Sequence, residues 1–288
     1  MILNNTPWVQ SHSTSILPSG VNQESAKYLE EYSGSVNVIV LEDSITAEQL
    51  WAFCETIKPL QEGWLGFVLT TNTMNGLSWL VNDDMEMSEI LDLESGAIHR
   101  HARQIWSILT EGKVDVSMIL WGQWRNTGYF REQYDHLYLD IDAIQADCKA
   151  GKVPLILPFI RDKGSIVPVD WISFATSTAI EIGAAKLIIP TTNSQAISNF
   201  SMLRLSEAKN ILETWGLPYL CHRYLTAMVS FIESDVANAR AHFVPVPSDI
   251  MTEILTIDWA DSSTMVSSTK FHQIPTEWNV YHQGSIQR

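Results

Sequence analysis

The sequence predicts an α/β fold in which helices cover both faces of a mostly parallel β-sheet. At least six short apolar runs alternate with segments whose apolar residues recur at helical spacing, an order typical of parallel strands joined by crossover helices. Hydrophobic residues make up 45% of the 288-residue chain, which is enough to bury a substantial core. The predicted architecture is therefore a three-layer α/β/α sandwich.

The chain opens with a β–α–β unit. Residues 36–41 (VNVIVL) form a β-branched run typical of a buried strand. Residues 46–58 then show helical apolar spacing, and Pro59 is expected to end that helix. A second apolar strand follows at 64–70. A right-handed crossover would make the two strands parallel.

The same periodicities and capping signals predict the remaining elements. Two helices at 82–95 and 96–111 precede two strands, at 114–121 and 123–129, that are expected to pair. Gly151 is expected to end a helix that begins after Asp140. The later predictions are strands at 153–160, 186–189, 241–246 and 264–267, a turn at 162–164, and helices at 173–183, 206–215 with Ser206 as cap, 223–234 and 249–255.

The domain prediction places one folded unit between two loose ends. Residues 1–24, rich in Ser, Asn and Pro, are expected to form a flexible N-terminal arm. Residues 25–268 would form one domain with an N-lobe at about 25–150 and a C-lobe at about 151–268. Residues 269–288 lack clear periodicity and are expected to form a C-terminal tail.

Charge and cysteine content narrow the partners and the compartment. The formal net charge is −15, and so acidic a surface repels nucleic-acid phosphates and anionic lipids. No run approaches about 18 uninterrupted apolar residues, and the first 20 residues contain no Arg, so we expect neither a membrane span nor a targeting leader. The three cysteines lack disulfide or metal-ligand spacing, which predicts no metal site and favours a cytoplasmic location.

Ordered fragments of the chain carry a resemblance to a known family. The fragments are residues 140–144 (DIDAI), 151–158 (GKVPLILP), 184–188 (AAKLI), 249–256 (DIMTEILT) and 264–266 (TMV). Their order resembles the amino-acid kinase family over residues 36–266, in particular N-acetylglutamate kinase and the kinase-like domain of N-acetylglutamate synthase. The resemblance implies the amino-acid kinase (carbamate kinase-like) fold.

The positions that handle ATP in that family hold other residues here. Where the family has a lysine followed by two glycines after the first strand, this chain has Val40 and then two carboxylates, Glu42 and Asp43. The catalytic lysine position falls near Tyr224, with Arg223 beside it. Phosphoryl transfer depends on positioning and charge neutralisation, so the resemblance implies a degenerate member without ATP-dependent phosphoryl transfer and without a cofactor.

The resemblance also supplies candidate residues for a site. The substrate-contacting acid of the family falls at Ile172, with Asp170 two residues earlier, so Asp170, Tyr224 and Arg223 are the candidate catalytic residues. A polar loop follows the second strand, and Glu253 and Thr264 match positions near the arginine site of the family. The candidate ligand-binding residues are Thr70, Asn72, Gly76, Asp170, Glu253 and Thr264. An ordinary polar loop and a helix-end surface acid are the alternative interpretations.

Three functional hypotheses remain open at this point. The first is a regulatory protein that binds a small amino-acid-like ligand or a partner, and that is either a homo-oligomer or the partner of an enzyme subunit. The second is a divergent enzyme that modifies amino acids or acyl groups in the same cleft. The third is a structural oligomerising subunit. Only 22 residues follow Val266, so we expect no second domain like the acetyltransferase domain of the synthases.

Overall fold

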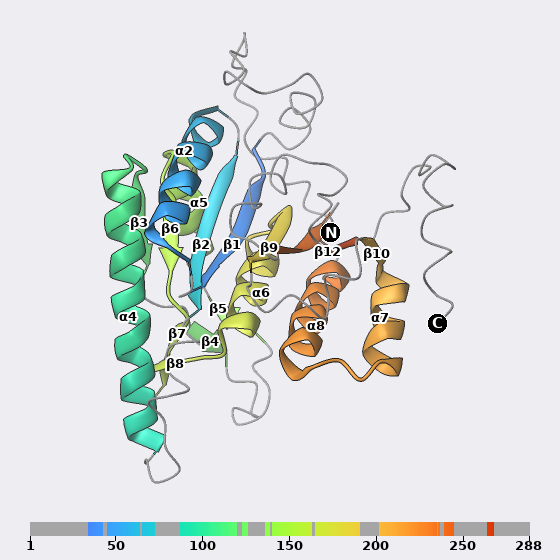
Figure 1. Cartoon of the computed structure of the whole chain (residues 1–288). Coiled ribbons are helices and arrows are strands. Elements are labelled where there is room, and N and C mark those ends of the chain that lie inside the picture. The colour runs from blue at the N-terminus through green and yellow to red at the C-terminus, as the bar shows by residue number, and fades with distance from the viewer. Residues whose placement is uncertain are drawn as a thin grey trace.

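The computed structural model describes most of the chain between residues 34 and 267. The described residues are 34–42, 45–63, 65–72, 87–119, 123–125, 136–138, 140–162, 165–190, 202–234, 236, 239–244 and 264–267. They form one large sheet with helices on both faces (Figure 1). The predicted three-layer α/β/α sandwich is therefore confirmed.

The large sheet has eight strands in the order β10-β12-β11-β9-β1-β2-β6-β3, and every neighbouring pair is parallel except β11 and β12. The predicted opening unit is present, since β1 and β2 pair in parallel with Val38 opposite Val68. The strands are β1 (Val36–Glu42), β2 (Gly66–Asn72), β3 (Val116–Ile119), β6 (Val153–Ile156), β9 (Lys186–Pro190), β10 (Met202–Arg204), β11 (Arg240–Val244) and β12 (Thr264–Ser267).

Alternation along β1 divides the molecule into two cores. Val38 and Val40 belong to a cluster with the helices α5, α6, α7 and α8, whereas Ile39 and Leu41 belong to a cluster with α2 and α4. Successive side chains of a strand point to opposite faces, so these helices form the two outer layers. The helices are α2 (Ala47–Gly63), α4 (Met87–Glu111), α5 (Ile141–Lys149), α6 (Trp171–Glu181), α7 (Leu205–Thr214) and α8 (Tyr219–Glu233).

Two small antiparallel hairpins lie outside the large sheet. Strands β4 (Gln123–Arg125) and β5 (His136–Tyr138) form one, and β7 (Phe159–Asp162) and β8 (Ser165–Pro168) form the other. The predicted pairing of 114–121 with 123–129 is therefore wrong, because β3 pairs with β6 and β4 pairs with β5. The single strand predicted at 153–160 is two strands, β6 and β7.

Several helix boundaries also differ from the prediction. Helix α2 continues past Pro59 to Gly63, because the hydrogen bond that a proline removes is only one of those that hold a helix of 17 residues. The two helices predicted at 82–95 and 96–111 are one helix, α4, which passes through Gly96. Helix α8 begins at Tyr219, and α7 is preceded by Arg204 rather than Ser206. The short strands β5, β8 and β10 were not predicted, and the helix predicted at 249–255 lies outside the described residues.

Two glycines fit their local geometry. Gly151 follows α5 with a φ of 73°, a left-handed conformation that favours glycine, as predicted for the end of that helix. At Gly112, just after α4, an added Cβ would lie 2.8 Å from Sγ of Cys54 in α2. The lack of a side chain at Gly112 thus lets α2 and α4 approach closely.

Candidate functional site

The carboxyl ends of β1, β2, β6 and β9 define the candidate site. In the sheet, β2 and β6 lie on one side of β1, and β9 lies on the other side. The chain first runs from β1 to β2, and α6 later connects the half of the sheet that contains β6 to β9, so the strand order reverses at β1. Ligands of open α/β sheets bind outside the carboxyl ends of the strands at such a reversal of strand order. The segment that leads into α6 lies at this edge, since the backbone N–H of Val169 donates to the carbonyl of Pro158, 2.9 Å away and just beyond β6.

Asp170 holds the first turn of α6. Its Oδ2 accepts hydrogen bonds from the backbone N–H of Ser173 at 2.9 Å and from Oγ of Ser173 at 2.6 Å. Its Oδ1 accepts a hydrogen bond from Arg223 of α8, which completes an ion pair. Both side chains are mostly shielded, with exposed fractions of 22% for Arg223 and 30% for Asp170. The carboxylate therefore links α6 to α8.

The surroundings of this ion pair are charged and aromatic. The guanidinium of Arg223 lies 5.5 Å from the centre of the Tyr219 ring. Burial alone would lower the pKa of Arg223, but the hydrogen bond and charge of Asp170, together with Tyr219, raise it. Burial, and then the negative charge of Asp170, raise the pKa of Glu94 on α4. A half-buried carboxyl from the other helical layer thus lies within electrostatic reach of Asp170.

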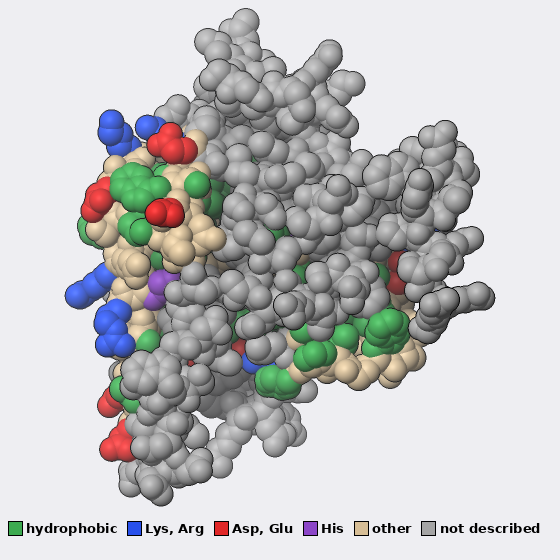
Figure 2. Space-filling view, viewed as in Figure 1, with side chains coloured by type: hydrophobic (Ala, Val, Ile, Leu, Met, Phe, Trp, Pro, Cys, Tyr) green, Lys and Arg blue, Asp and Glu red, His purple; other side chains and the backbone are tan. Residues whose placement is uncertain are grey.

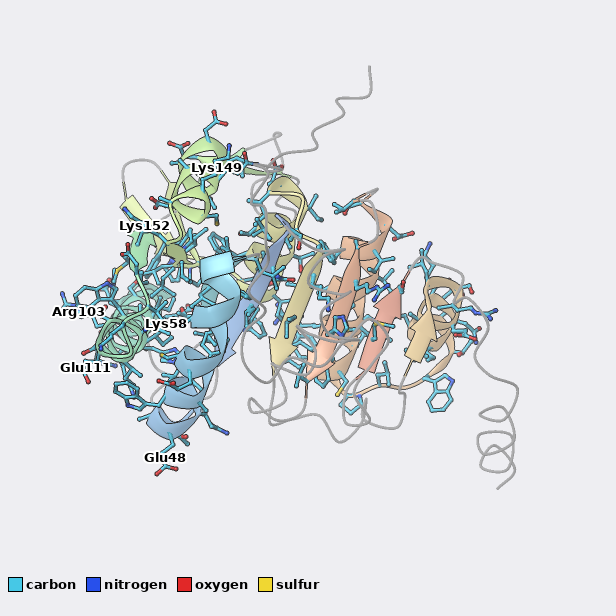
Figure 3. All side chains as sticks on the ribbon, turned by 90° about the horizontal axis from the view of Figure 1, so that it is seen from above. Glu48, Lys58, Arg103, Glu111, Lys149 and Lys152 are labelled. Carbon is cyan, nitrogen blue, oxygen red and sulfur yellow. The ribbon has the colours of Figure 1, made fainter. Side chains whose placement is uncertain are left out.

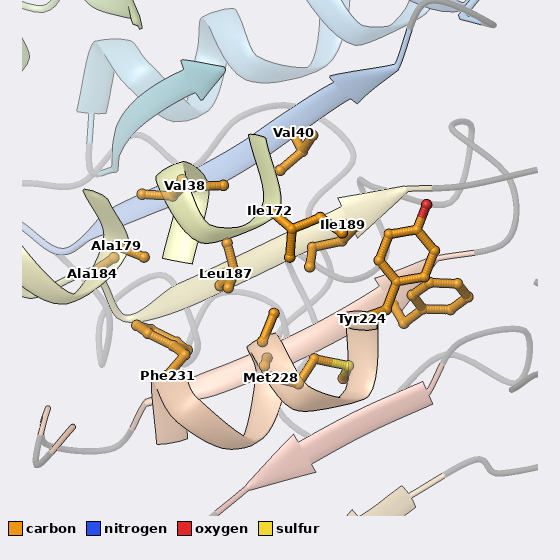
Figure 4. Close-up of a cluster of buried hydrophobic side chains, with 14 of the residues drawn as sticks. Val38, Val40, Ile172, Ala179, Ala184, Leu187, Ile189, Tyr224, Met228 and Phe231 are labelled. Carbon is orange, nitrogen blue, oxygen red and sulfur yellow. The ribbon is translucent and has the colours of Figure 1, made fainter. Parts of the chain in front are cut away.

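Aromatic rings fill the space beside the ion pair. Tyr224 is 2% exposed, and its ring centre lies 5.8 Å from that of Trp171 and 5.1 Å from that of Phe243. These rings come from α8, α6 and β11. Figure 4 shows Tyr224 at one end of the buried cluster that α6 and α8 form with β1 and β9. The three rings are core packing at the carboxyl end of the sheet.

Two buried threonines near the end of β2 carry hydroxyls without partners among the described residues. Thr70 and Thr71 are both fully buried, and neither Oγ1 has a hydrogen-bond partner among the described residues. Thr70 is in register with Val40 and Ile156, which face α6. Thr71 is in register with Leu41, which faces α2 and α4. Thr70 therefore points toward the layer that holds Asp170, and Thr71 points away from it.

The structure brings some predicted site residues together and leaves others undescribed. Asp170 and Arg223 pair directly, Tyr224 packs against Trp171, the residue after Asp170, and Thr70 lies two residues before the end of β2, toward the carboxyl ends of the strands. Asn72 and Thr264 lie in β2 and β12, but their side chains are not described. Gly76, Glu253 and Asp43 lie outside the described residues.

Three neighbours of the site were not predicted: Glu94, Ser173 and Tyr219. Ser173 follows from a signal present in the sequence, since an Asp directly before an apolar helical run is a typical N-cap whose carboxylate binds the third helical residue. Glu94 gave no such signal, because it comes from a helix 76 positions earlier in the chain than Asp170. Its proximity is a product of the tertiary fold.

Other kinds of site are not found in the described part of the chain. No group of three or more His, Cys, Asp or Glu side chains there could hold a metal ion. None of its helices has the length and hydrophobicity that a membrane crossing requires.

Solved structures resemble the whole arrangement. N-acetylglutamate synthase from Neisseria gonorrhoeae, complexed with coenzyme A and N-acetyl-glutamate, superposes with a TM-score of 0.71 at 17% identity over 91% of this chain and 69% of the synthase. Carbamate kinase from Giardia lamblia, bound to AMP-PNP, superposes with a TM-score of 0.57 at 10% identity over 82% of this chain and 99% of the kinase. The chain has the amino-acid kinase fold. UMP kinase from Ureaplasma parvum also superposes, with a TM-score of 0.51 at 12% identity over 81% of this chain and 99% of the kinase.

Comparison of the sequence with family models and curated proteins assigns the chain to no family. No family model matches the chain. No curated protein matches it either. At such low identity, the structural likeness shows the fold alone, and the function must be argued from the residues of this chain.

Proposed function

We propose that this protein is a catalytically degenerate member of the amino-acid kinase fold that binds a small amino-acid-like ligand in a regulatory role, without ATP-dependent phosphoryl transfer. The observation that carries the proposal is the packing of Tyr224. The resemblance places the catalytic lysine near this position, where the chain instead has a ring that is 2% exposed and packed between Trp171 and Phe243. A buried phenol ring cannot neutralise the charge of a transferring phosphoryl group.

A second phosphate-handling position is also apolar. Val40 stands where the family has a lysine, and Val40 is fully buried in the core with α6. Its side chain carries no charge and presents nothing to a ligand. The two positions that would supply cations to a nucleotide are thus both part of the hydrophobic core.

Among the described residues beside Tyr224, the cation Arg223 is already paired. Arg223 beside Tyr224 bonds to Asp170, and Asp170 also occupies the N-terminus of α6 through Ser173. A helix N-terminus and a guanidinium would otherwise attract an anionic phosphate. Here the carboxylate of Asp170 satisfies both, which opposes a triphosphate at this end of α6.

Thr70 supports a small polar ligand in place of a nucleotide. A buried hydroxyl without a partner is uncommon in folded proteins, and it suggests a group that a ligand or a water molecule completes. Hydroxyl and carboxylate groups suit the amino and carboxyl groups of an amino-acid derivative. The structural neighbour from Neisseria gonorrhoeae was solved with N-acetyl-glutamate and with L-arginine, which belong to this ligand class.

Thermal unfolding with and without ligands tests the proposal. We expect L-arginine or N-acetyl-glutamate to raise the melting temperature, by mass action, and MgATP to leave it unchanged. We also expect no phosphoryl transfer from ATP to N-acetyl-glutamate. Turnover at ordinary enzyme rates, roughly 1–1000 per second, would refute the degenerate assignment.

A matched pair of variants locates the ligand. Thr70→Val removes the unpartnered hydroxyl toward α6, and Thr71→Val removes the equivalent hydroxyl on the opposite face of the same strand. Both variants should fold at least as stably as the wild type, because neither hydroxyl has a hydrogen bond to lose among the described residues. Only Thr70→Val should reduce the ligand-induced shift. An equal shift in both variants would exclude Thr70 from the binding site.

A further inference from the structure

The ion pair between Asp170 and Arg223 is partly open to solvent. Neither side chain is sealed in the core, since each keeps between a fifth and a third of its surface exposed, at 22% for Arg223 and 30% for Asp170. Tyr219, whose ring lies against the guanidinium, is 72% exposed. Figure 2 shows apolar side chains at the surface along the lower edge of the molecule, where α7 connects to α8. A small ligand can therefore approach the pair from solvent.

The two carboxylate oxygens of Asp170 have different roles. Oδ2 accepts hydrogen bonds from the backbone N–H and from Oγ of Ser173, and these bonds hold the first turn of α6. Oδ1 accepts a hydrogen bond from one nitrogen of Arg223, Nη2. A guanidinium can donate two parallel hydrogen bonds to one carboxylate, and the described contact uses one of them. Oδ1 and Arg223 can thus exchange partners while the helix cap stays in place.

The charges around the pair include more acid than base. Glu94 of α4 adds a half-buried carboxyl within electrostatic reach of Asp170. Arg223 supplies the positive charge on the α8 side. Figure 3 shows four other cations on the side of the molecule that carries α2, α4 and α5, away from α8: Lys58, Arg103, Lys149 and Lys152. The described part of this site therefore presents one guanidinium together with two carboxyl groups.

We propose that the ligand is a free α-amino acid, which inserts as a zwitterion between Asp170 and Arg223. Its carboxylate replaces Oδ1 of Asp170 on the guanidinium, and its ammonium group replaces Arg223 on Oδ1. Both new contacts are hydrogen bonds between opposite charges, so the exchange leaves neither side chain with an unpaired charge. This assignment rests on the proposed function, and it narrows the ligand class to amino acids whose two α groups are both free.

Ligands with only one of the two charges fit this exchange poorly. An N-acylated amino acid has no ammonium group, so its carboxylate would take Arg223 and leave Asp170 without a counter-charge near Glu94. An amine without a carboxylate would bind Asp170 and leave Arg223 partly buried without an anion. A partly buried charge that loses its partner is costly. A zwitterion is thus the small ligand that satisfies both sides of the pair.

Calorimetric titration of the full-length chain with three related ligands tests the inference. The ligands are L-glutamine, Nα-acetyl-L-glutamine and L-glutamine methyl ester. Glutamine has a neutral side chain, so acetylation removes only the ammonium charge and esterification removes only the carboxylate charge. We expect the dissociation constant of L-glutamine to be at least about tenfold lower than that of either derivative, because each derivative leaves one member of the ion pair without a partner.

Three variants assign the two charges to their side chains. Asp170→Asn keeps a helix-capping side chain and removes the acid, so the preference for L-glutamine over its acetyl derivative should fall at least about tenfold. Arg223→Gln should reduce the preference over the methyl ester by a similar factor. Asp140→Asn alters the corresponding cap of α5, which has no ion pair among the described contacts, and should leave both preferences unchanged. Circular dichroism melting checks that each variant is folded.

Other results would overturn the inference. Equal binding of L-glutamine and its acetyl derivative by the wild type would exclude the ammonium contact. Preferences that persist in Asp170→Asn and Arg223→Gln would place the α groups at other residues. Stabilisation by N-acetyl-glutamate without binding of L-glutamine would exclude the free amino acid and leave the proposed function standing. If the wild type and the variants bind none of these ligands, the proposed function fails together with the inference.

Discussion

At the residue scale, Asp170 shows why a candidate catalytic acid can have a structural role. The chain contains a second aspartate with the same local geometry, since Asp140 caps α5 by accepting the backbone N–H of Ala143 at 3.0 Å. Asp140 has no ion pair among the described contacts, whereas Asp170 also bonds to Arg223. Substitutions at the two aspartates can therefore distinguish the contribution of a helix cap to stability from that of a cap combined with an interhelical ion pair.

Alanine substitutions at these two positions give a direct prediction. We expect Asp140→Ala to lower the free energy of unfolding by about 1 kcal/mol, the usual effect of losing a helix cap. We expect Asp170→Ala to lower it by about 2–3 kcal/mol, because Arg223 is then left partly buried without its partner. Urea unfolding with an unchanged m-value is the measurement. Equal losses in the two variants would show that the ion pair adds nothing to stability.

At the residue scale, the sequence predicted several positions of the site but not the residues that contact them. The positions of Asp170, Arg223 and Tyr224 were named because the resemblance placed substrate and phosphate contacts there. Their actual partners could not be predicted, since Arg223 and Asp170 are 53 residues apart and meet only when α8 packs on α6. The burial of Tyr224 likewise depends on rings from α6 and β11. Local patterns report capping and periodicity, but they do not report contacts between distant helices.

At the scale of elements, the length of α4 shows how packing overrides local signals. Gly96 suggested a boundary between two helices, because a glycine in a helix costs about 1 kcal/mol relative to alanine. The helix passes through this position because Ile98, Ala102 and Ile105 all pack on the same core. The short strands β5, β8 and β10 were not predicted for the opposite reason, since three or four residues carry too little periodicity to be recognised.

Two glycine-to-alanine substitutions should have opposite effects. At Gly96, the described atom nearest to an added Cβ would be the flexible end of Arg100, at 3.9 Å, so Gly96→Ala should raise the free energy of unfolding by about 0.5–1 kcal/mol. At Gly151, the φ of 73° strains any other residue, so Gly151→Ala should lower it by about 1–2 kcal/mol although the space is open. Chemical denaturation of both variants measures whether each substitution raises or lowers the free energy of unfolding. A stabilised Gly151→Ala would contradict the left-handed turn after α5.

At the scale of the whole molecule, the sheet forms two separate hydrophobic cores, and the fold class followed from the sequence for that reason. Parallel strands covered on both faces are almost continuously apolar, and the runs at 36–41 and 186–189 have this property. The strand order could not be deduced, because adjacent strands such as β1 and β9 are separated by more than 140 residues. The order is set by which helices can cover which face.

The stability of the whole protein should depend on pH through His101. This residue of α4 is 8% exposed, neither ring nitrogen has a hydrogen-bond partner among the described residues, and burial lowers its pKa to about 4. Between the ordinary pKa of about 6.5 and about 4, the unfolded chain binds a proton that the folded chain excludes. The contribution of neutral His101 is therefore fully present above pH 6.5 and is lost as the pH falls. The expected loss is about 3 kcal/mol.

The variant His101→Leu isolates this effect from the carboxylates that titrate in the same range. Leucine keeps the site apolar and cannot take up a proton. The difference in unfolding free energy between wild type and variant should change by about 3 kcal/mol between pH 6.5 and pH 4, with the wild type losing more. Parallel pH profiles for the two proteins would show that His101 does not titrate on unfolding.

The cysteines lie where their reactivity can report local opening of the folded protein. Cys54 lies where α2 meets the end of α4, Cys148 lies in α5, and Cys221 is buried in α8. Burial, and then a neighbouring carboxylate, raise the pKa of Cys54 to about 11 and that of Cys148 to about 12, so reactive thiolate is scarce in the folded state. A thiol reagent at neutral pH would modify Cys54 and Cys221, which are buried in opposite helical layers, mainly when the layer around each separates from the sheet. The labelling rates would then compare how often each of the two helical layers opens, without any engineered probe.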